Sequence, residues 1–215
     1  MINFHIVTLF PESIEPYLKS SILGRAIEAK KIKISFYDPK KFTRDRYGRV
    51  DRRPYGGGPG MVLEPDGMLR AAQKAIGSKK GVEKIFFATD GAVFSEEMAK
   101  KLSKKKDIVF ICGRYEGVDA RVQKILKAKK LSVGPYVLTG GELPAATLID
   151  AISRFVPGVL GKIESLEASR VSSPDVYTRP EVLEWKGKKY RVPKVLLTGN
   201  HAKMDEWRRS KRQKG

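Results

Sequence analysis

Ile108-Val-Phe-Ile-Cys-Gly-Arg-Tyr-Glu-Gly117 joins five consecutive apolar residues to a turn bounded by glycines. A short apolar run that ends in such a turn is typical of a strand buried on both faces. The following residues, 117–128, place apolar side chains from Val118 to Leu126 at the spacing of one helix face. The stretch therefore predicts a strand, a turn and a helix, the repeating unit of a parallel sheet.

The same alternation continues on both sides of this stretch. Strands are expected over residues 2–9, 32–36, 85–88, 108–112 and 131–133. Helices are expected over 12–29, from Glu64-Pro65 onward, after Ser95, over 117–128 and over 142–154. Alternation of this length predicts an α/β fold, a parallel sheet with helices on both faces.

Three glycine-rich segments follow predicted strands: Thr89-Asp90-Gly91, residues 113–117 and residues 132–144. Because the carboxyl ends of parallel strands share one edge of a sheet, we expect these segments to form a ligand site there. Glycine lets backbone N–H and C=O groups approach a ligand closely. No lysine is positioned beside these turns, so the site suits a neutral adenine edge better than a phosphate. The alternative is that the glycines only form tight turns.

A fourth glycine cluster, Tyr55-Gly-Gly-Gly-Pro-Gly-Met61, ends a long segment without periodicity over residues 39–60. Five arginines precede it or flank it: Arg44, Arg46, Arg49, Arg52 and Arg53. Arginine binds phosphates and stacks on bases, and a tyrosine ring offers a further stacking face. This segment is therefore a candidate RNA contact, with a flexible surface loop as the alternative.

Charge and composition narrow the function classes. The 215 residues include 43 Lys and Arg against 24 Asp and Glu, a net charge of +19, which favours a polyanionic partner over a merely solvated surface. The single Cys112 excludes a disulfide scaffold, and with only His5 and His201 beside it a multi-ligand zinc site is excluded as well. No apolar run approaches ~18 residues, so we expect no membrane span and a location in the reducing cytoplasm.

The residue pattern changes after Gly161, because the periodic apolar residues end there and polar residues follow. We predict a cofactor-binding α/β domain over 1–161, a linker over 162–176 and a small, mostly helical, basic RNA-binding domain over 177–215. Within the last domain we expect a helix after Arg179-Pro180, a strand near 192–197 and a basic helix from about Asn200.

Six motifs together resemble one family. They are Arg53-Pro-Tyr-Gly-Gly-Gly-Pro-Gly-Met61, Gly113-Arg-Tyr-Glu-Gly117, Tyr136-Val-Leu-Thr-Gly-Gly-Glu-Leu-Pro144, Ser153-Arg-Phe-Val-Pro-Gly-Val-Leu-Gly161, Tyr177-Thr-Arg-Pro180 and Leu197-Thr-Gly-Asn-His201. Through them the chain resembles, from Ile2 to about Trp207, the bacterial tRNA (guanine-N1)-methyltransferases of the SPOUT superfamily.

The resemblance implies a deep trefoil knot in the α/β domain, and an obligate homodimer with its active site at the subunit interface. It also implies methyl transfer from S-adenosylmethionine to N1 of the guanosine immediately 3′ to the anticodon of tRNA, with Mg²⁺ required for transfer. Cofactor contacts are implied at Phe86, Phe87, Gly113, Tyr115, Glu116, Gly117, Val133, Gly134, Pro135, Tyr136, Val137, Leu138, Gly140, Gly141 and Pro144. We expect RNA contacts at Arg52, Arg53, Tyr55, Gly57, Arg179, His201 and Arg208.

The reaction needs a base, because N1 of guanine carries a proton at neutral pH. The resemblance assigns Arg154 to the target base, where a guanidinium can stabilise negative charge on O6. The family usually places an aspartate, its proposed base, where this chain has Ser169, and serine is a poor base. Among the nearby acids Glu164, Glu167 and Asp175, we expect Glu167 to serve, with Asp175 next.

Two alternatives follow from this departure and from the breadth of the superfamily. One is a cofactor-binding and RNA-binding dimer with weakened catalysis. The other is a SPOUT methyltransferase that acts on a different RNA position.

Overall fold

The computed structural model describes residues 1–160 and 175–212. The chain divides into two compact units, Met1–Leu160 and Gly161–Gly215, which are described separately. In the described residues no helix combines the length and the apolar character needed to cross a membrane.

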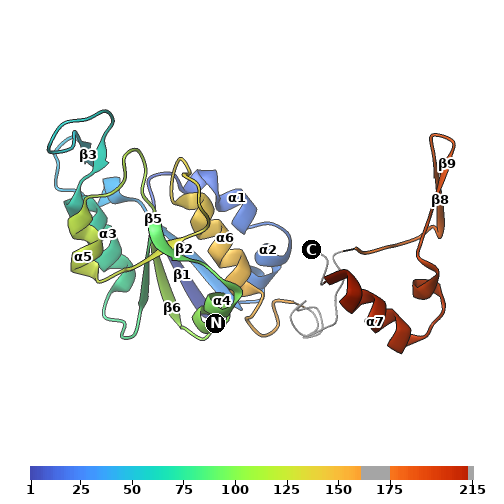
Figure 1. Ribbon diagram of the computed structural model, residues 1–215. Helices are drawn as coiled ribbons and strands as arrows, with labels where there is room; N and C mark the ends of the chain where they lie inside the picture. Colours follow the sequence, from blue (N-terminus) through green and yellow to red (C-terminus); the bar gives the residue numbers. More distant parts are fainter. Residues whose placement is uncertain (161–174, 213–215) are drawn as a thin grey trace. The chain divides into compact units, whose positions relative to one another are not determined.

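Unit 1 is built on a five-stranded sheet in the order β2-β1-β6-β5-β7 (Figure 1). Its strands are β1 (Ile2–Val7), β2 (Ile32–Tyr37), β5 (Glu83–Val93), β6 (Asp107–Ile111) and β7 (Lys129–Ser132). Every neighbouring pair is parallel, which confirms the predicted parallel sheet.

Helices cover both faces of the sheet, because side chains of a strand alternate between faces. On β6, Ile108 and Phe110 pack into one core with α1 (Glu15–Leu18), α2 (Ser21–Glu28), α4 (Glu96–Leu102) and α6 (Glu142–Ser153). Val109 and Ile111 pack into the opposite core with α3 (Pro65–Ile76) and α5 (Ala120–Leu126). The central strand is therefore buried on both sides, as its apolar run predicted.

Two predicted helices are shorter than expected. The helix expected over 12–29 is divided into a 3-10 helix, Pro11–Ser13, followed by α1 and α2, and Ser21 at the break has a φ of +50°. The helix expected over 117–128 begins only at Ala120, because the carboxylate of Asp119 accepts the backbone N–H of Arg121 and caps it.

The prediction of a strand-to-helix loop at Thr89-Asp90-Gly91 is wrong. These residues lie inside β5, whose pairing with β7 shifts register between Phe87 and Ala92. A Cβ on Gly91 would lie 2.7 Å from the backbone of Leu131, so glycine permits β7 to approach here. The irregularity is a bulge that extends the strand rather than ending it.

Over its described residues, 175–212, unit 2 combines one hairpin with one α-helix and is less helical than predicted. Its elements are β8 (Val182–Trp185), β9 (Lys188–Arg191), a 3-10 helix (Lys194–Leu197) and α7 (His201–Arg212). The prediction of a helix after Pro180 is wrong, because the residues there form an antiparallel hairpin. Lys186 and Gly187 both have positive φ and form its two-residue turn. The strand expected near 192–197 is wrong as well, since pairing ends at Arg191 and Pro193 follows. The basic helix is confirmed, and the Asn200 side chain caps it by accepting the N–H of Lys203.

A buried polar cluster joins the starts of β1 and β6. The Asp107 carboxylate lies 2.9 Å from Nε2 of His5 and accepts a hydrogen bond from Asn3 at 3.1 Å. Burial by itself raises the pKa of Asp107, but the hydrogen bonds from His5 and Asn3 outweigh it, so this pKa is lowered. The ionised carboxylate therefore stabilises the folded chain.

We predict that Asp107→Asn lowers the free energy of unfolding at pH 7 by about 1–3 kcal/mol, the cost of disrupting a buried charge-assisted hydrogen bond. A lowered pKa contributes stability above the unfolded value of about 3.9 and loses it as pH falls through the folded value. Urea unfolding from pH 7 to pH 3 should therefore show a smaller acid-dependent loss for the variant. Asp90→Asn, at an exposed pair with Lys130, is the control and should change stability by less than about 1 kcal/mol. An equally steep acid loss in wild type and Asp107→Asn would contradict the prediction.

Candidate active site

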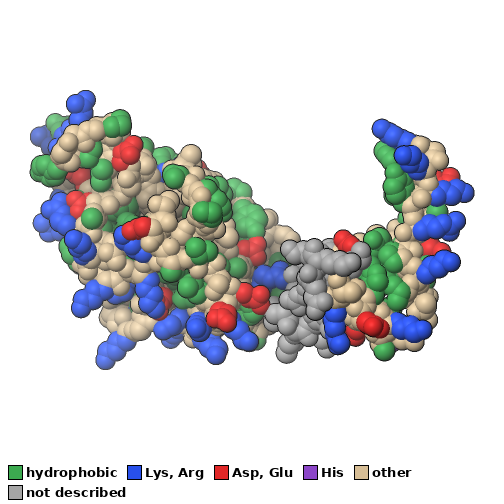
Figure 2. Space-filling view, in the orientation of Figure 1, with side chains coloured by type: hydrophobic (Ala, Val, Ile, Leu, Met, Phe, Trp, Pro, Cys, Tyr) green, Lys and Arg blue, Asp and Glu red, His purple; other side chains and the backbone are tan. Residues whose placement is uncertain are grey.

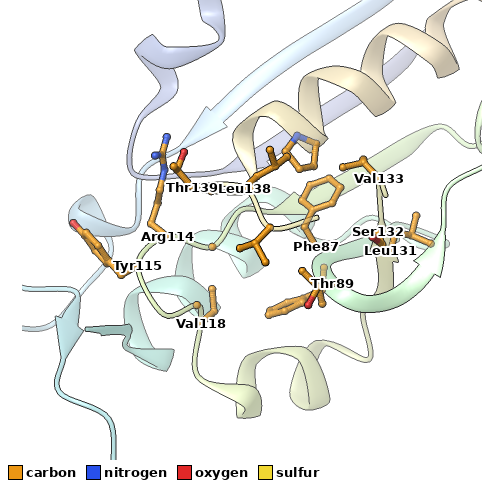
Figure 3. A pocket seen from close by; sticks show the side chains of 18 of the residues that line it. Phe87, Thr89, Arg114, Tyr115, Val118, Leu131, Ser132, Val133, Leu138 and Thr139 are labelled. Carbon is orange, nitrogen blue, oxygen red and sulfur yellow. The ribbon is translucent and has the colours of Figure 1, made fainter. Parts of the chain in front are cut away.

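A cavity of about 370 Å³ opens at the carboxyl ends of β6 and β7 (Figure 3). Three parts of the chain form its walls: the middle of β5, the turn after β6, and the segment that leads from β7 into α6. Its lining comprises Phe86, Phe87, Ala88, Thr89, Gly113, Arg114, Tyr115, Glu116, Gly117, Val118, Leu131, Ser132, Val133, Tyr136, Val137, Leu138, Thr139, Gly140, Gly141 and Pro144.

The walls are held together by main-chain contacts. The N–H of Gly141 donates to the carbonyl of Gly113 at 2.9 Å, and Arg114 and Gly140 form an isolated β-bridge. The segment after β7 therefore returns to the turn after β6, although β5 lies between these two strands. A Cβ on Gly141 would lie 2.6 Å from Cα of Cys112, so only glycine allows this approach.

A buried carboxylate beside the cavity is paired with an arginine of its lining. Nε of Arg114 lies 2.9 Å from Oε2 of Glu142, and the hydroxyl of Thr8 donates to Oε1 of the same carboxylate at 2.6 Å. Glu142 is 1% exposed, and the Arg114 guanidinium also lies over the ring of Phe10. Besides this pair, the lining offers backbone groups, apolar side chains such as Phe87, and one exposed carboxylate, Glu116.

Cys112 beside this pair is not a nucleophile. Its burial, and secondarily the nearby Glu142 carboxylate, raise the pKa of the thiol well above its ordinary value. The thiol therefore stays protonated at neutral pH, and Cys112 acts as a small core residue.

Most residues that the resemblance implied as cofactor contacts line this cavity. Gly134 and Pro135 do not, because they lie in the bend after β7, where Gly134 contacts the ring of Tyr136. Sequence reasoning had not assigned several lining residues to the cofactor: Ala88, Thr89, Arg114, Val118, Leu131, Ser132 and Thr139. Four of them, Thr89, Arg114, Ser132 and Thr139, lie in the three glycine-rich segments that the sequence predicted at a ligand site.

Arg154 lies outside this cavity. It follows the last residue of α6 and lines a second cavity of about 230 Å³ with Tyr17, Asp150 and Ser153. The hydroxyl of Tyr17 donates to the Asp150 carboxylate, and this hydrogen bond raises the pKa of Tyr17. The Ser153 hydroxyl is buried and has no hydrogen-bond partner among the described residues. Within one chain, the arginine and the larger cavity are therefore separate sites.

The arginine-rich segment is more ordered than the expectation of a loop suggested. β3 (Asp51–Arg52) pairs with β4 (Val62–Leu63), and the Asp45 carboxylate accepts the N–H groups of Tyr47 and Arg49. These two hydrogen bonds are the main reason that the pKa of Asp45 is lowered.

The candidate RNA contacts of unit 1 lie in this ordered segment. Arg52 pairs with Asp45 and Glu64. Arg53 and Gly57 are exposed, and the Tyr55 ring is fully exposed. The segment also adjoins the cavity rim, since the N–H of Glu116 donates to the carbonyl of Met61 at 2.9 Å.

The predicted residues of unit 2 stand as follows. Asp175, Arg179 and His201 are exposed, and half-buried Arg208 pairs with Asp205 at 2.7 Å. Glu164, Glu167 and Ser169 lie outside the described residues.

Sequence reasoning missed an exposed face on the hairpin. Leu183 pairs with Tyr190 and Trp185 with Lys188, so these four side chains share one face of the two strands. Leu183, Tyr190 and Trp185 are all exposed. Exposed aromatic rings beside a lysine are typical of surfaces on which RNA bases stack. Side chains alternate between the two faces of these strands, and this alternation indicates the exposed face. The prediction of a helix over the same residues left it unused.

Comparisons with known proteins show the family of the chain. A family model described as tRNA (Guanine-1)-methyltransferase TrmD matches residues 2–215. The chain belongs to this family. It is 41% identical over 213 residues to the tRNA (guanine-N(1)-)-methyltransferase of Clostridioides difficile, covering 96% of this chain and 90% of that protein. The proteins of the same name from Campylobacter jejuni subsp. doylei and Caldanaerobacter subterraneus are 42% and 43% identical, covering 94% and 97% of this chain and 88% and 86% of theirs.

We predict that Gly141→Ala weakens binding of S-adenosylmethionine at least tenfold, because the added Cβ forces the segment after β7 away from the turn after β6. Isothermal calorimetry with the methyl donor and its demethylated product measures this, and far-UV circular dichroism confirms that the variant is folded. Thr147→Ala, on an exposed position of the same helix α6, is the control and should bind normally. Wild-type affinity in Gly141→Ala would show that this close approach does not shape the cofactor site.

Proposed function

We propose that this chain transfers the methyl group of S-adenosylmethionine to N1 of the guanosine immediately 3′ to the anticodon of tRNA. The observation that carries the proposal is the cavity in which motifs of the tRNA (guanine-1)-methyltransferase family meet. In the reaction N1 gains the methyl, the bond from methyl carbon to sulfur breaks, and the proton of N1 passes to a carboxylate of the enzyme.

The cavity residues fit S-adenosylmethionine. Turns at Gly113, Gly117 and Gly140 offer backbone groups to an adenine edge, and Phe87 and Pro144 offer apolar contacts. When bound, this cofactor supplies an electrophilic methyl group on a sulfonium. The enzyme's own contribution there is orientation and the exclusion of water, because the Arg114 guanidinium is ion-paired with the Glu142 carboxylate.

The trefoil knot belongs to this proposal. It is supported by the path of the chain after β7, which crosses β5 and returns to hydrogen-bond with Gly113 before α6 begins. A segment that returns in this way can pass through the loop formed by the preceding strands.

The homodimer with a composite active site is also part of the proposal. The cavity rim exposes apolar side chains: Tyr115, Tyr136, Val137, Leu138 and Leu143. A second copy that covers this rim would bury them. Because Arg154 lies outside the cavity of its own chain, a partner subunit is the natural source of the guanidinium at the target base.

Within the proposed reaction, Arg154 stabilises the charge that develops on O6 as the N1 proton leaves. Glu167 or Asp175 accepts that proton, and both lie close in sequence to the position of the family's usual aspartate. Mg²⁺ is included as a requirement of transfer on the family resemblance. Chelation with EDTA, with transfer measured before and after addition of Mg²⁺, tests this part alone.

We assign RNA binding to two basic regions. In unit 1 these are Arg52, Arg53, Tyr55 and Gly57, and in unit 2 they are Arg179, His201 and Arg208. The division into a cofactor domain over 1–161, a linker over 162–176 and an RNA-binding domain over 177–215 follows the same assignment. Reducing cytoplasm is the proposed location, supported by the single, free Cys112.

The function is tested by incubating the chain with labelled S-adenosylmethionine and tRNA transcripts that carry G or A after the anticodon. Label should appear only in the G transcript, as 1-methylguanosine at that position. Methylation elsewhere would favour the alternative of another RNA target. Cofactor and RNA binding without transfer would favour the weakened dimer.

We predict that Arg154→Ala lowers kcat at least 100-fold and leaves the Kd of the cofactor within about twofold, because the guanidinium acts on the base. Arg154→Lys, which keeps the charge, should retain more activity. Equal losses of turnover and cofactor affinity would argue against this role.

A mixing experiment locates Arg154 between subunits. If the site is composite, Arg154→Ala and Gly141→Ala subunits mixed in equal amounts, at a cofactor concentration too low to occupy the Gly141→Ala site, should recover about one quarter of the wild-type activity measured under the same conditions. Half of the random dimers are then heterodimers, each with one intact site. No recovery, with exchange of subunits verified by native mass spectrometry, would place Arg154 and the cofactor in the same chain.

For the base, Glu167→Gln should slow transfer at least 100-fold near pH 7, whereas Asp175→Asn should have a smaller effect. Rates measured from pH 6 to pH 9 distinguish a lost base from weakened binding. Normal rates in Glu167→Gln together with a strong loss in Asp175→Asn would assign the base to Asp175.

A further inference from the structure

Lysines gather where four of the five strands of unit 1 begin. The four segments are 30–33 at β2, 79–84 at β5, 104–107 at β6 and 127–130 at β7. Because all the strands are parallel, their amino ends lie at one edge of the sheet. We call the lysines of these segments the lysine rim: Lys30, Lys31, Lys33, Lys79, Lys80, Lys84, Lys104, Lys105, Lys106, Lys127, Lys129 and Lys130.

Backbone hydrogen bonds bring segments of the rim together in space. The N–H of Ile2 donates to the carbonyl of Lys31 at 3.1 Å, and the N–H of Asn3 donates to the carbonyl of Lys106 at 2.8 Å. Two segments 75 positions apart therefore flank the start of β1. Figure 2 shows Lys and Arg side chains along the edge of unit 1 where Figure 1 places the N-terminus.

The positive charge of the rim is largely uncompensated. The four segments contain two carboxylates, Glu83 and Asp107, and both are buried. Glu83 lies between Lys105 at 3.5 Å and Lys129 at 2.6 Å, while Asp107 is bound by His5 and Asn3. Lys130 pairs with Asp90, and Glu28 at the end of α2 adds one exposed negative charge nearby. All lysines of the rim except Lys84 are exposed.

The rim is distinct from the cofactor cavity. The cavity lies at the carboxyl ends of β6 and β7, and the rim at the amino ends. At β6 a strand of five residues separates the two edges by roughly 17 Å, whereas at β7 the rim comes closer, because Lys130 directly precedes the lining residues Leu131 and Ser132. No lysine of the rim lines the cavity.

The chemistry of the rim fits backbone phosphates. The four segments contain neither arginine nor aromatic residues. Lysine binds phosphate as a flexible point charge, whereas reading or stacking on bases favours arginine and aromatic rings. The segment around Tyr55, with its five arginines, has the opposite composition. Because five strands span four spacings of about 4.8 Å, the rim is roughly 19 Å wide, enough to meet several phosphates.

We propose that the lysine rim is a second RNA-binding surface that holds backbone phosphates of the tRNA substrate without reading its sequence. The inference rests on the proposed function only in taking tRNA as the polyanion. The rim contributes affinity and faster association, and the methyl transfer step does not depend on it.

The test uses Lys80→Gln/Lys104→Gln/Lys106→Gln, three rim residues whose side chains take part in no ion pair within the described residues. The matched control replaces the same three lysines by arginine, which keeps the charge. Filter binding of tRNA from 0.05 to 0.3 M salt should show at least tenfold weaker binding for the glutamine variant at 0.1 M. The slope of log K against log salt should fall by about 0.7–0.9 for each phosphate that the variant no longer neutralises. The arginine variant should bind like wild type, and kcat at saturating tRNA should be unchanged in both.

Acetylation footprinting locates the RNA-binding surface within the whole chain. Bound tRNA should slow acetylation of rim lysines more than that of the exposed Lys74 and Lys124 on helices α3 and α5. Three results overturn the inference: tRNA binding and salt slope unchanged in the glutamine variant, uniform protection of all lysines, or an arginine variant as weak as the glutamine variant. Loss of binding to phosphatidylserine vesicles with tRNA binding intact would assign the rim to membranes and overturn it as well.

Failure of the rim and failure of the proposed function are distinguishable. An enzyme that methylates tRNA normally and binds it independently of the rim contradicts the rim alone. Rim-dependent RNA binding without methyl transfer contradicts the function alone.

Discussion

The structure of unit 1 depends on the return of the chain from β7 to the turn after β6. The two backbones lie in direct contact there, because the N–H of Gly141 donates to the carbonyl of Gly113 and the Gly141 backbone packs against Cys112. This single approach forms one wall of the cavity and sets where α6 begins. Through α6 it also fixes the positions of Glu142, at the first turn, and Arg154, after the last.

The close approach also explains how charge is arranged around the cavity. It brings Glu142 to Arg114 and Thr8 in an almost solvent-free position, where an unpaired carboxylate would be costly. Apart from Arg114 and the exposed Glu116, the lining consists of main-chain groups and uncharged side chains, which suits adenine. The excess of positive charge, +19 over the whole sequence, includes the arginine-rich segment, the lysine rim and basic residues of unit 2.

The separation of Arg154 from the cavity explains why the proposed reaction would need a dimer. If one subunit holds the cofactor and the other supplies the guanidinium, the reaction centre exists only in the assembled enzyme. The apolar rim of the cavity and the second cavity at Arg154 are then complementary parts of one site. The proposed binding groups are divided in a similar way. Backbone groups of the cavity bind the cofactor, the arginine-rich segment contacts RNA bases and phosphates, and the lysine rim contacts RNA phosphates alone.

The sequence by itself determined the parallel α/β architecture and the glycine turns after β6 and β7, because alternating burial and backbone freedom are local properties. The family was indicated by the resemblance of six motifs. It misjudged Thr89-Asp90-Gly91 and the hairpin from Val182 to Arg191. In the first case glycine served contact with a distant strand rather than a turn, and in the second two positive φ values outweighed the helix signal at Pro180. The pairing of Arg114 with Glu142 and the distance of Arg154 from the cavity were decided only by tertiary structure. Both features depend on which segments far apart along the chain come into contact. Residue spacing carries no information about such contacts.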